Sequence, residues 1–247
     1  SIRRQRQMCI RDRYSELDSV IHRLDPRTKM ILGLAFILTV LGTPERAWCA
    51  FGFNLGLILL AGLLSRIPLL YLLTRSAAIV PFALLVTLFR VLPQGKEGLV
   101  AGMVVGFRAW LSAMALVLLS ATTPFPLLLK GMEKLRMPPA LVQILSFMYR
   151  YIFVLVDEAM RMERAWESRG AGSRWWASFR AMAGVVGVLF IRSYERAERV
   201  YQAMLARGFE GEVRTLNPLK FSARDLAFGT ASLLCLGFSW VLIAFGG

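Results

Sequence analysis

The sequence is poor in charge and in the residues that build metal or redox centres. Only 19% of its 247 residues are charged, and its mean hydropathy is +0.54, whereas a typical soluble domain has about 25% charged residues. We therefore do not expect a water-soluble globular protein. The three cysteines, Cys9, Cys49 and Cys235, are far apart, and His22 is the only histidine, so the chain offers neither a zinc-type cluster nor a disulfide framework. We expect no metal ion and no cofactor in this chain.

A nucleotide-binding loop is also missing from the sequence. No segment matches the pattern G-x-x-x-x-G-K-[ST], in which backbone amides and a lysine hold phosphate groups. Clustered Asp, His or Cys residues of the kind that form an active site are missing too, which leaves an integral-membrane enzyme without support. We therefore expect no ATP site of this kind in this chain.

What the sequence has instead is a series of long apolar runs. A helix that crosses a bilayer needs about 20 apolar residues, and five runs approach or reach that length. Asp25 followed by Pro26 predicts the start of the first helix, because the carboxylate caps free amides and proline at the first helical position loses no hydrogen bond. We predict an all-α integral membrane protein with about five transmembrane helices. The expected spans are residues 30–43, 47–65, 76–92, 98–123 and 226–247.

The basic residues set the orientation that we expect for these spans. Lys and Arg outnumber Asp and Glu by 30 to 16, a net charge of +14, and short cytoplasmic loops retain such residues. We expect a cytoplasmic segment in 1–29, four spans in 30–123, a cytoplasmic or interfacial region of long helices in 124–222, and the last span in 223–247. The N-terminus is then cytoplasmic and the C-terminus outside. The apolar run 140–156 remains as a competing span.

A repeat lies within the region 124–222. Residues 157–170 and 195–208 align at a fixed offset of 38 with five identical positions, and both copies end in Arg-Gly. Apolar residues recur at helical spacing in each copy, which predicts one buried stripe per helix. We predict two long helices with amphipathic last parts and a left-handed glycine cap at each end. The expected stripes are Ala159, Met162 and Trp166 in the first copy and Ala197, Val200 and Met204 in the second.

The two helix ends are the candidate functional residues. Either Arg-Gly alone is explained by ordinary capping, since arginine favours the negative end of the helix dipole and glycine ends the helix. A matched pair indicates two equivalent docking sites on a two-fold partner with acidic grooves, because an arginine fork can hold a carboxylate bidentately. The candidate coupling residues are Ser168, Arg169, Gly170, Ala206, Arg207 and Gly208, and Arg161, Trp166, Arg199 and Met204 support them on the same helices.

Several parts of the sequence resemble one family. They are HRLDPRTK (residues 22–29), the stretch 135–162 that begins LRMPPALVQ, and the terminal tripeptides Ser-Arg-Gly at 168–170 and Ala-Arg-Gly at 206–208. Together they resemble the transmembrane T component of energy-coupling-factor (ECF) transporters, in its cobalt-type CbiQ subgroup, over residues 12–247. Ser168 departs from the first Ala of the family pattern. Serine is nearly as small, but its hydroxyl can bond locally and soften the helix end.

The resemblance implies the scaffold of an importer rather than an enzyme. In such transporters two ATP-binding-cassette ATPase subunits, here CbiO-like, bind ATP and Mg²⁺, and a separate CbiM-like membrane subunit captures the substrate. The two coupling helices would insert into the ATPase pair. The resemblance also implies a bacterial inner-membrane location, cobalt as the transported ion and a small accessory membrane subunit as a further candidate partner. Nickel or a vitamin as the substrate, and a self-contained carrier or channel, remain alternatives.

Four further features of the sequence are Arg108, a tryptophan pair, a short amphipathic segment and the excess of positive charge. Arg108 lies inside an apolar run, where it either snorkels to the interface or contacts the substrate-binding subunit. Trp175 and Trp176 are expected to anchor at the membrane interface, and residues 124–136 to form a short amphipathic helix along it. The positive charge suits anionic lipids and acidic protein grooves. Without an aromatic-basic recognition module, nucleic acid is not an expected partner.

Overall fold

The computed structural model describes residues 19, 21–22, 24–44, 47–168, 175–209, 211 and 223–246, and helices make up most of that length. No strand occurs among these residues. The predicted all-α class is therefore confirmed. The chain divides into two compact units, residues 1–135 with 219–247 and residues 136–218.

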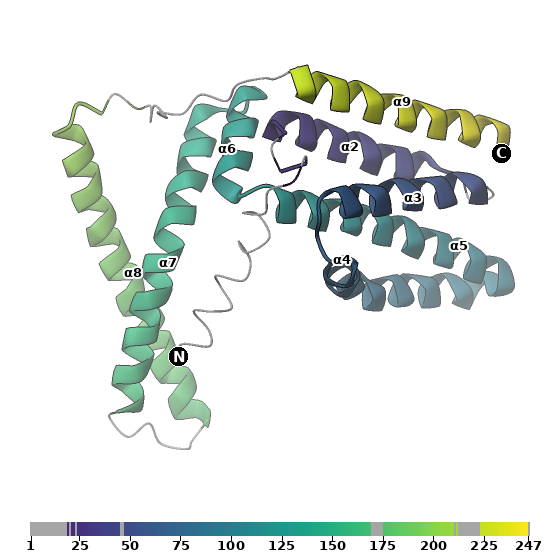
Figure 1. Cartoon of the computed structure of the whole chain (residues 1–247). Helices are drawn as coiled ribbons and strands as arrows, with labels where there is room; N and C mark the ends of the chain where they lie inside the picture. The colour runs from purple at the N-terminus through teal and green to yellow at the C-terminus, as the bar shows by residue number, and fades with distance from the viewer. Residues whose placement is uncertain are drawn as a thin grey trace. The chain divides into compact units, whose positions relative to one another are not determined.

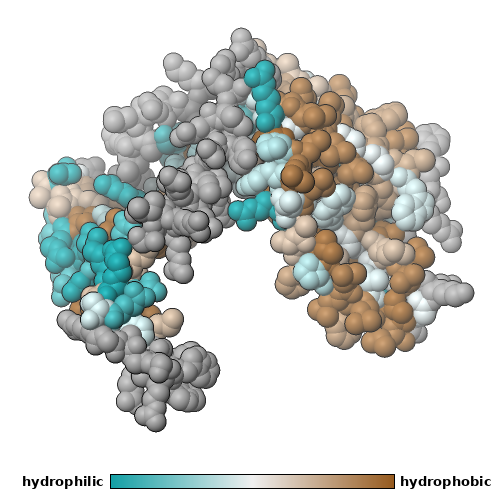
Figure 2. Space-filling view, turned by 60° about the horizontal axis from the view of Figure 1, so that its bottom comes forward, coloured by the Kyte–Doolittle hydropathy of each residue, from teal (hydrophilic) through white to brown (hydrophobic). Residues whose placement is uncertain are grey.

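The first unit is a bundle of apolar helices drawn from both ends of the chain (Figure 1). In this bundle α2 packs against α5, α6 and α9, and α3 packs against α5 and α9. Figure 2 shows hydrophobic side chains over much of the visible surface of this unit, as expected for helices that face lipid. Its elements are α2 (Pro26–Gly42), α3 (Trp48–Leu64), α4 (Leu69–Ser76), the 3-10 helix η1 (Ala77–Ile79), α5 (Val80–Thr122), α6 (Phe125–Lys134) and α9 (Ala223–Gly246).

The start of α2 has the geometry that the sequence predicts. Asp25 is the N-cap, and its side chain accepts a hydrogen bond of 2.9 Å from the Arg27 amide. Pro26 is the first helical residue, where its missing N–H leaves no bond unmade. The predicted cap is therefore confirmed.

The third and fourth predicted spans form a helical hairpin, and the label α5 covers both of its helices. The helix has 43 residues, but Gly95 in its middle has φ +58° and ψ −127°, a conformation outside the helical region that separates two helices. The two halves then lie in close contact, because a Cβ on Gly102 would sit 2.7 Å from Thr87 Cα, and a Cβ on Gly106 would sit 3.0 Å from Ala83 Cβ. Small residues thus let the two backbones approach.

The helix that contains the third expected span begins earlier than that span. Its apolar helix runs from Leu69 to Leu92 through α4 and η1, whereas the expected start was residue 76. The charge of Arg75 marked the expected boundary, but Arg75 lies within α4 with its guanidinium carbon 5.9 Å from the centre of the Tyr71 ring. A cation placed over an aromatic face does not end the helix.

Four helices among the described residues are long and apolar enough to cross a membrane. They are Leu69–Leu92, Gly98–Thr122, Asp225–Ile243 and Pro139–Glu167. The helices α2 and α3 each have 17 residues, the lower end of spanning length. The chain is thus a multi-pass membrane protein by its helices. Pro139–Glu167 contains the competing span of the sequence analysis, and its cytoplasmic placement stays a prediction.

A buried lysine joins three helix ends in the first unit. Lys29 is only 8% exposed, and its ammonium lies at the start of α2, close to the end of α5. Nearby, the Asp25 amide donates a 2.8 Å hydrogen bond to Asp225 Oδ1 at the start of α9. The three acceptors of the lysine are the His22 carbonyl, the Thr122 carbonyl and the Thr123 hydroxyl oxygen, at 3.2, 3.2 and 3.3 Å.

Arg108 has a structural partner inside the first unit. Its guanidinium donates a 2.6 Å hydrogen bond to the carbonyl oxygen of Thr43, the residue that caps the C-terminus of α2. A cation at a helix C-terminus is favoured by the free carbonyls and the helix dipole. This bond explains why a charged side chain is tolerated within the fourth expected span. The Thr43 carbonyl was not predicted as its partner.

The helix α6 is amphipathic, as predicted, and it packs within the first unit. A Cβ on Gly131 would lie 3.3 Å from Pro26 Cβ and 3.3 Å from Met30 Sδ, so this helix lies close against α2. The second compact unit begins at Arg136, after α6, whereas the sequence analysis grouped residues 124–222. The cytoplasmic or interfacial location of that region stays a prediction.

The second unit is a pair of long helices, α7 (Pro139–Glu167) and α8 (Trp175–Leu205). They pack against each other and run antiparallel (Figure 1). Two long helices over the repeat were predicted, and both are present. The side chains of Trp175 and Trp176, in the first turn of α8, lie outside the description, so their role as interface anchors stays a prediction.

Candidate coupling site

The second copy of the repeat ends α8 in a complete Schellman motif. The Gly208 amide donates to the Leu205 carbonyl at 3.0 Å, and the Phe209 amide donates to the Met204 carbonyl at 3.1 Å. Gly208 has φ +78°, a left-handed conformation that glycine adopts without strain. The left-handed cap predicted for this copy is therefore confirmed. The motif leaves Ala206 and Arg207 exposed at the helix tip.

The first copy of the repeat ends α7 at Ser168. Its amide donates to the Arg164 carbonyl at 3.0 Å, and its hydroxyl donates to the Ala165 carbonyl at 3.0 Å. This is the local bond that the sequence analysis expected of a serine at this position. Arg169 and Gly170 lie outside the described residues, so the predicted cap of this copy stays a prediction.

The two ends lie at opposite ends of the helix pair. Since α7 and α8 are antiparallel (Figure 1), Ser168 follows the end of α7 near the start of α8, while Ala206 lies one helix length away. A helix of 29 residues is about 40 Å long at 1.5 Å per residue. The pair can therefore reach two separate protein surfaces.

The supporting residue Arg161 belongs to an ion-pair cluster that links the two helices. Glu158 of α7 is bonded by Arg161 on its own helix and by Arg192 of α8. Hydrogen bonds from Arg161 and then Arg192 lower the pKa of the Glu158 carboxyl, and the same bond raises the pKa of Arg161. The Glu158 carboxyl therefore keeps its charge beside Arg161 and Arg192 to a lower pH than a free glutamate does.

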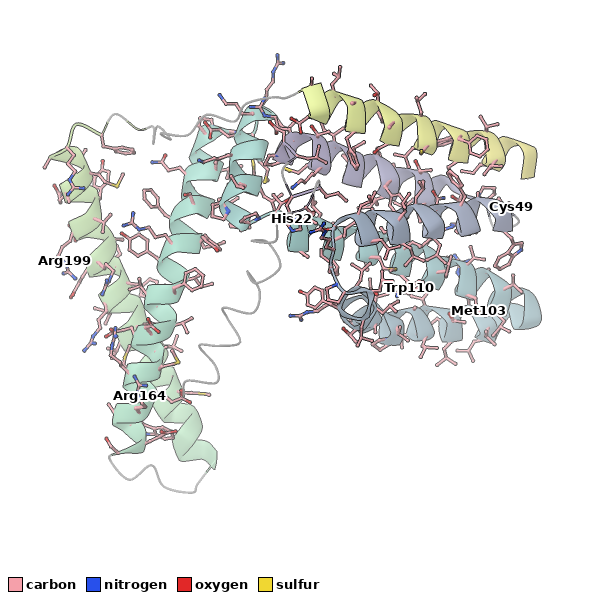
Figure 3. All side chains as sticks on the ribbon, viewed as in Figure 1. His22, Cys49, Met103, Trp110, Arg164 and Arg199 are labelled. Carbon is pink, nitrogen blue, oxygen red and sulfur yellow. The ribbon has the colours of Figure 1, made fainter. Side chains whose placement is uncertain are left out.

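The second supporting arginine, Arg199, occupies the equivalent position on α8. It lies 3.9 Å from Glu195 one turn earlier, a spacing typical of an exposed i,i+4 pair. Its side chain projects outward from α8, and Arg164 lies on α7 near the first helix end (Figure 3). Exposed pairs of this kind contribute little to stability, so these arginines remain available to a partner surface.

The predicted buried stripes are only partly buried. Trp166 and Met204 are half-buried, and Ala197 is exposed. The reason is that α7 and α8 have only each other to pack against in this unit, so one contact face cannot cover both stripes. Apolar residues do recur at helical spacing on both helices, but the prediction that these stripes are buried was wrong.

An open apolar groove of about 660 Å³ lies between α7 and α8. This groove was not predicted from the sequence. Its signal is an apolar and aromatic series at three- and four-residue spacing on α7, upstream of the repeat, opposite a matching series on α8. Among the lining residues are Ile144, Phe147, Tyr151 and Leu155 of α7 and Ala197, Tyr201 and Met204 of α8.

The described residues show no constellation for metal chemistry. No three of His, Cys, Asp and Glu come together in the described part of the chain in a way that could hold a metal ion. His22 Nδ1 lies 2.7 Å from the Ser19 hydroxyl oxygen, an ordinary hydrogen-bonding distance.

Comparison with known proteins points to one family. The family model CbiQ, described as cobalt transport protein, matches residues 18–217. The chain is 28% identical to the cobalt transport protein CbiQ of Rhodobacter capsulatus, over 76% of this chain and 80% of that protein. It is 31% identical to the energy-coupling factor transporter transmembrane protein EcfT of Heliobacterium modesticaldum, over 90% of this chain and 95% of that one.

A third relative, the EcfT protein of Lactococcus lactis, is 28% identical over 89% of this chain and 92% of its own length. The matches thus cover both the apolar helices and the long helix pair. They confirm the family that the motifs at 22–29 and 135–162 indicated. The chain belongs to the CbiQ family of cobalt transport proteins, the transmembrane T components of energy-coupling-factor transporters.

Proposed function

We propose that this chain couples two ATPase subunits to a separate substrate-binding membrane protein through the ends of α7 and α8. The observation that carries the proposal is the tip of α8, where a Schellman motif ends the helix and leaves the small Ala206 and the charged Arg207 exposed. A small residue permits close approach, and the arginine fork suits a carboxylate in the partner. The equivalent end of α7 carries Ser168 and the sequence Arg169-Gly170.

The ATPases in this proposal are CbiO-like and supply all of the ATP chemistry. The sequence has no phosphate-binding loop, so ATP and Mg²⁺ bind to those subunits and this chain holds no cofactor. ATP binding draws the two ATPases together and moves the two helix tips. Because the tips are about 40 Å apart along stiff helices, each tip follows one ATPase subunit, and the helices carry the movement to the membrane.

The substrate partner is a CbiM-like membrane protein, and the transported ion is cobalt. A relative in Methanocorpusculum labreanum carries the name putative fused cobalt transport protein CbiMQ, with 33% identity over 39% of this chain, and that name joins the two parts. We place the N-terminus in the cytoplasm and the C-terminus outside a bacterial inner membrane, with anionic lipids around the basic loops. A small accessory membrane subunit is a further partner of the same assembly.

The competing function is a self-contained carrier or channel. Such a protein places several polar or ionisable groups along its spans. Here the charge within the fourth span, Arg108, is bonded to the Thr43 carbonyl at the end of α2. That bond favours a structural role for the arginine over a place in an ion pathway.

The test is to reverse the charge at both helix ends. The full assembly is purified in mild detergent and reconstituted in liposomes, with the wild type compared with Arg169→Glu/Arg207→Glu. We expect the double variant to stay inserted and folded but to lose the ATPases on purification and to lose ATP-driven cobalt uptake. Lys134→Glu, an exposed charge reversal on α6, is the matched control and should retain both. Normal uptake by the double variant contradicts the proposal, and uptake by the chain alone supports the carrier.

A further inference from the structure

The membrane bundle contains a second cavity, separate from the groove between α7 and α8. Its volume is about 250 Å³, and four helices line it. The lining residues come from the first half of α2, the last half of α3, the last part of α5 and the first half of α9. All four segments lie at the end of the bundle where Lys29 joins the helices.

Small residues on several helices create this space. Gly33 on α2, Ala61 on α3 and Ala231 on α9 line the cavity without filling it. A Cβ on Gly33 would meet only Leu119 Cδ2, at 3.9 Å, an ordinary contact. The volume exceeds the ~150 Å³ of an engineered apolar cavity that stays dry and takes up benzene.

The chemistry of the wall favours an apolar occupant. Most lining side chains are aliphatic or aromatic, among them Leu32, Phe36, Leu118 and Phe228. The ammonium of Lys29, at one end, already has three protein acceptors. A water molecule needs two to four polar partners to be stable in a cavity, and this wall does not supply them.

The rim of the cavity lies on the surface that faces lipid. Leu60 and Leu64 of α3 line it and remain 54% and 46% exposed. The chain is a multi-pass membrane protein by its helices and this rim is apolar, so we take the medium at the rim to be the hydrocarbon of a bilayer. Arg27, in the same helical turn as Lys29, has a side chain 28% exposed, and a basic residue at this end of α2 would suit the phosphate of a lipid headgroup.

We propose that this cavity holds an acyl chain of a membrane phospholipid, taken from the leaflet at the α2 N-terminal end. The chain enters past Leu60 and Leu64 and fills the space beside Gly33 and Ala231. The bound acyl chain makes the apolar contacts that larger side chains would make at these positions. In this way it keeps α9 packed on α2 and α3. The proposal rests on membrane insertion and is independent of the coupling role of α7 and α8.

The test uses a phosphatidylcholine and phosphatidylglycerol vesicle that contains a phospholipid with a photoreactive diazirine in its acyl chain. The complete transporter is reconstituted and irradiated, and labelled peptides are quantified by mass spectrometry. We expect strong labelling of cavity residues such as Cys235 and Ala231, measured relative to Leu38, an exposed residue of α2 that serves as the reference for bulk lipid.

A filling variant separates a specific site from general lipid contact. Gly33→Leu should occupy the cavity and reduce labelling of Cys235 at least fivefold, with labelling of Leu38 unchanged. Gly56→Leu is the matched control, because Gly56 lies on α3, has nothing near its Cβ position and does not line the cavity. It should keep the wild-type pattern.

Two results overturn the proposal. One is wild-type labelling of Cys235 no higher than in Gly33→Leu, which means that the cavity is empty. The other is labelling that appears in the isolated chain and disappears in the complete transporter, which means that a partner protein segment fills the cavity. Either result leaves ATPase binding at the helix ends unaffected, so the two proposals fail separately.

Discussion

The two units of this protein hold their helices together in opposite ways. In the first unit, polar groups are buried and bonded across helices, as with Lys29 and the Thr122 carbonyl or the Ser239 hydroxyl and Asn54 Oδ1. In the described part of the second unit, α7 and α8 are joined by the exposed ion pair of Glu158 with Arg192. Among the described residues of α7, only Val142 is buried.

The difference indicates which unit holds its helices more firmly. Buried hydrogen bonds in an apolar medium fix helix positions strongly, because an unbonded polar group there is costly. Exposed ion pairs fix them weakly. The second unit also leaves an aromatic groove open, and apolar surface of this kind marks sites for partners. We therefore expect the first unit to be the more rigid of the two, and the second to offer the more adaptable surface to a partner.

Removal of the buried lysine should produce the largest effect. Lys29→Met leaves the buried Asp25 and Asp225 without the charge that acts on both. Breaking a buried charge group by removal of one partner costs about 3–5 kcal/mol, a loss on the order of 10 °C in Tm for a chain of this size. Thermal unfolding in detergent measures it. Lys134→Met, on the exposed face of α6, is the control, and a shift as small as in that control would contradict the role of Lys29.

Closing the space between the two halves of α5 should cost less. In Gly102→Ala the new methyl group would lie 2.7 Å from Thr87 Cα, so the hairpin must open, at about 1–3 kcal/mol as for other overpacked cores. Gly56→Ala has nothing within 4 Å of its Cβ and should be neutral or slightly stabilising, since alanine favours a helix. Both variants are compared by thermal unfolding. Equal Tm values would mean that the hairpin does not depend on close approach.

A change at the tip of α8 should affect binding more than stability. Gly208→Ala puts a Cβ on a residue with φ +78°, which costs about 1–2 kcal/mol locally and frays the last turn. We expect the same Tm as wild type and at least a tenfold weaker association with the ATPases by pull-down titration. Gly187→Ala, within α8 and with open space at its Cβ, should change neither. Wild-type association of Gly208→Ala would show that the cap geometry is unimportant.

The smallest effect is expected from protons at the ion-pair cluster. Bonds from Arg161 and Arg192 lower the pKa of Glu158, so its contribution is complete above the usual glutamate pKa of about 4.3 and is lost as pH falls through the lowered value. Spin labels at Ala165→Cys and Val186→Cys, with the native cysteines replaced by serine, report the distance between α7 and α8. We expect no change from about pH 8 to about pH 5 and a wider distribution only below about pH 4. In Glu158→Gln the distance distribution between the two labels should be wide at every pH. A distribution equal to that of the wild type would show that the ion-pair cluster does not hold α7 and α8 together.

Much of the fold follows from the sequence because apolar runs and caps are local signals. Asp25 and Pro26 predicted the start of α2, and Gly208 predicted the end of α8. The start of the helix around the third expected span, at Leu69, was not predicted, because Arg75 was treated as a boundary although its charge lies over the Tyr71 ring. The bond from Lys29 to the Thr122 carbonyl and the bond from Arg108 to the Thr43 carbonyl join residues 93 and 65 positions apart, so no local pattern contains them.

For the candidate site too, local features were predicted from the sequence and tertiary features were not. The repeat identified Ser168 and Ala206 to Gly208 as helix ends, and periodicity identified the stripes. Periodicity could not show that α7 and α8 leave Ala197 exposed, because burial depends on what lies opposite a face. The groove beside Tyr151 needed the same tertiary information.

The most direct test of the central claim asks what the two helix ends touch in native membranes. A photoreactive benzoyl-phenylalanine is placed at Ala165 or Ala203, exposed and equivalent positions one turn before the two helix ends, and cross-linked chains are identified by mass spectrometry. Val186, exposed in the middle of α8, is the control position. We expect positions 165 and 203 both to cross-link to an ATPase subunit, at the same peptide of that subunit, and position 186 not to do so. Cross-links from 165 and 203 to lipid or to the substrate-binding protein alone would contradict it.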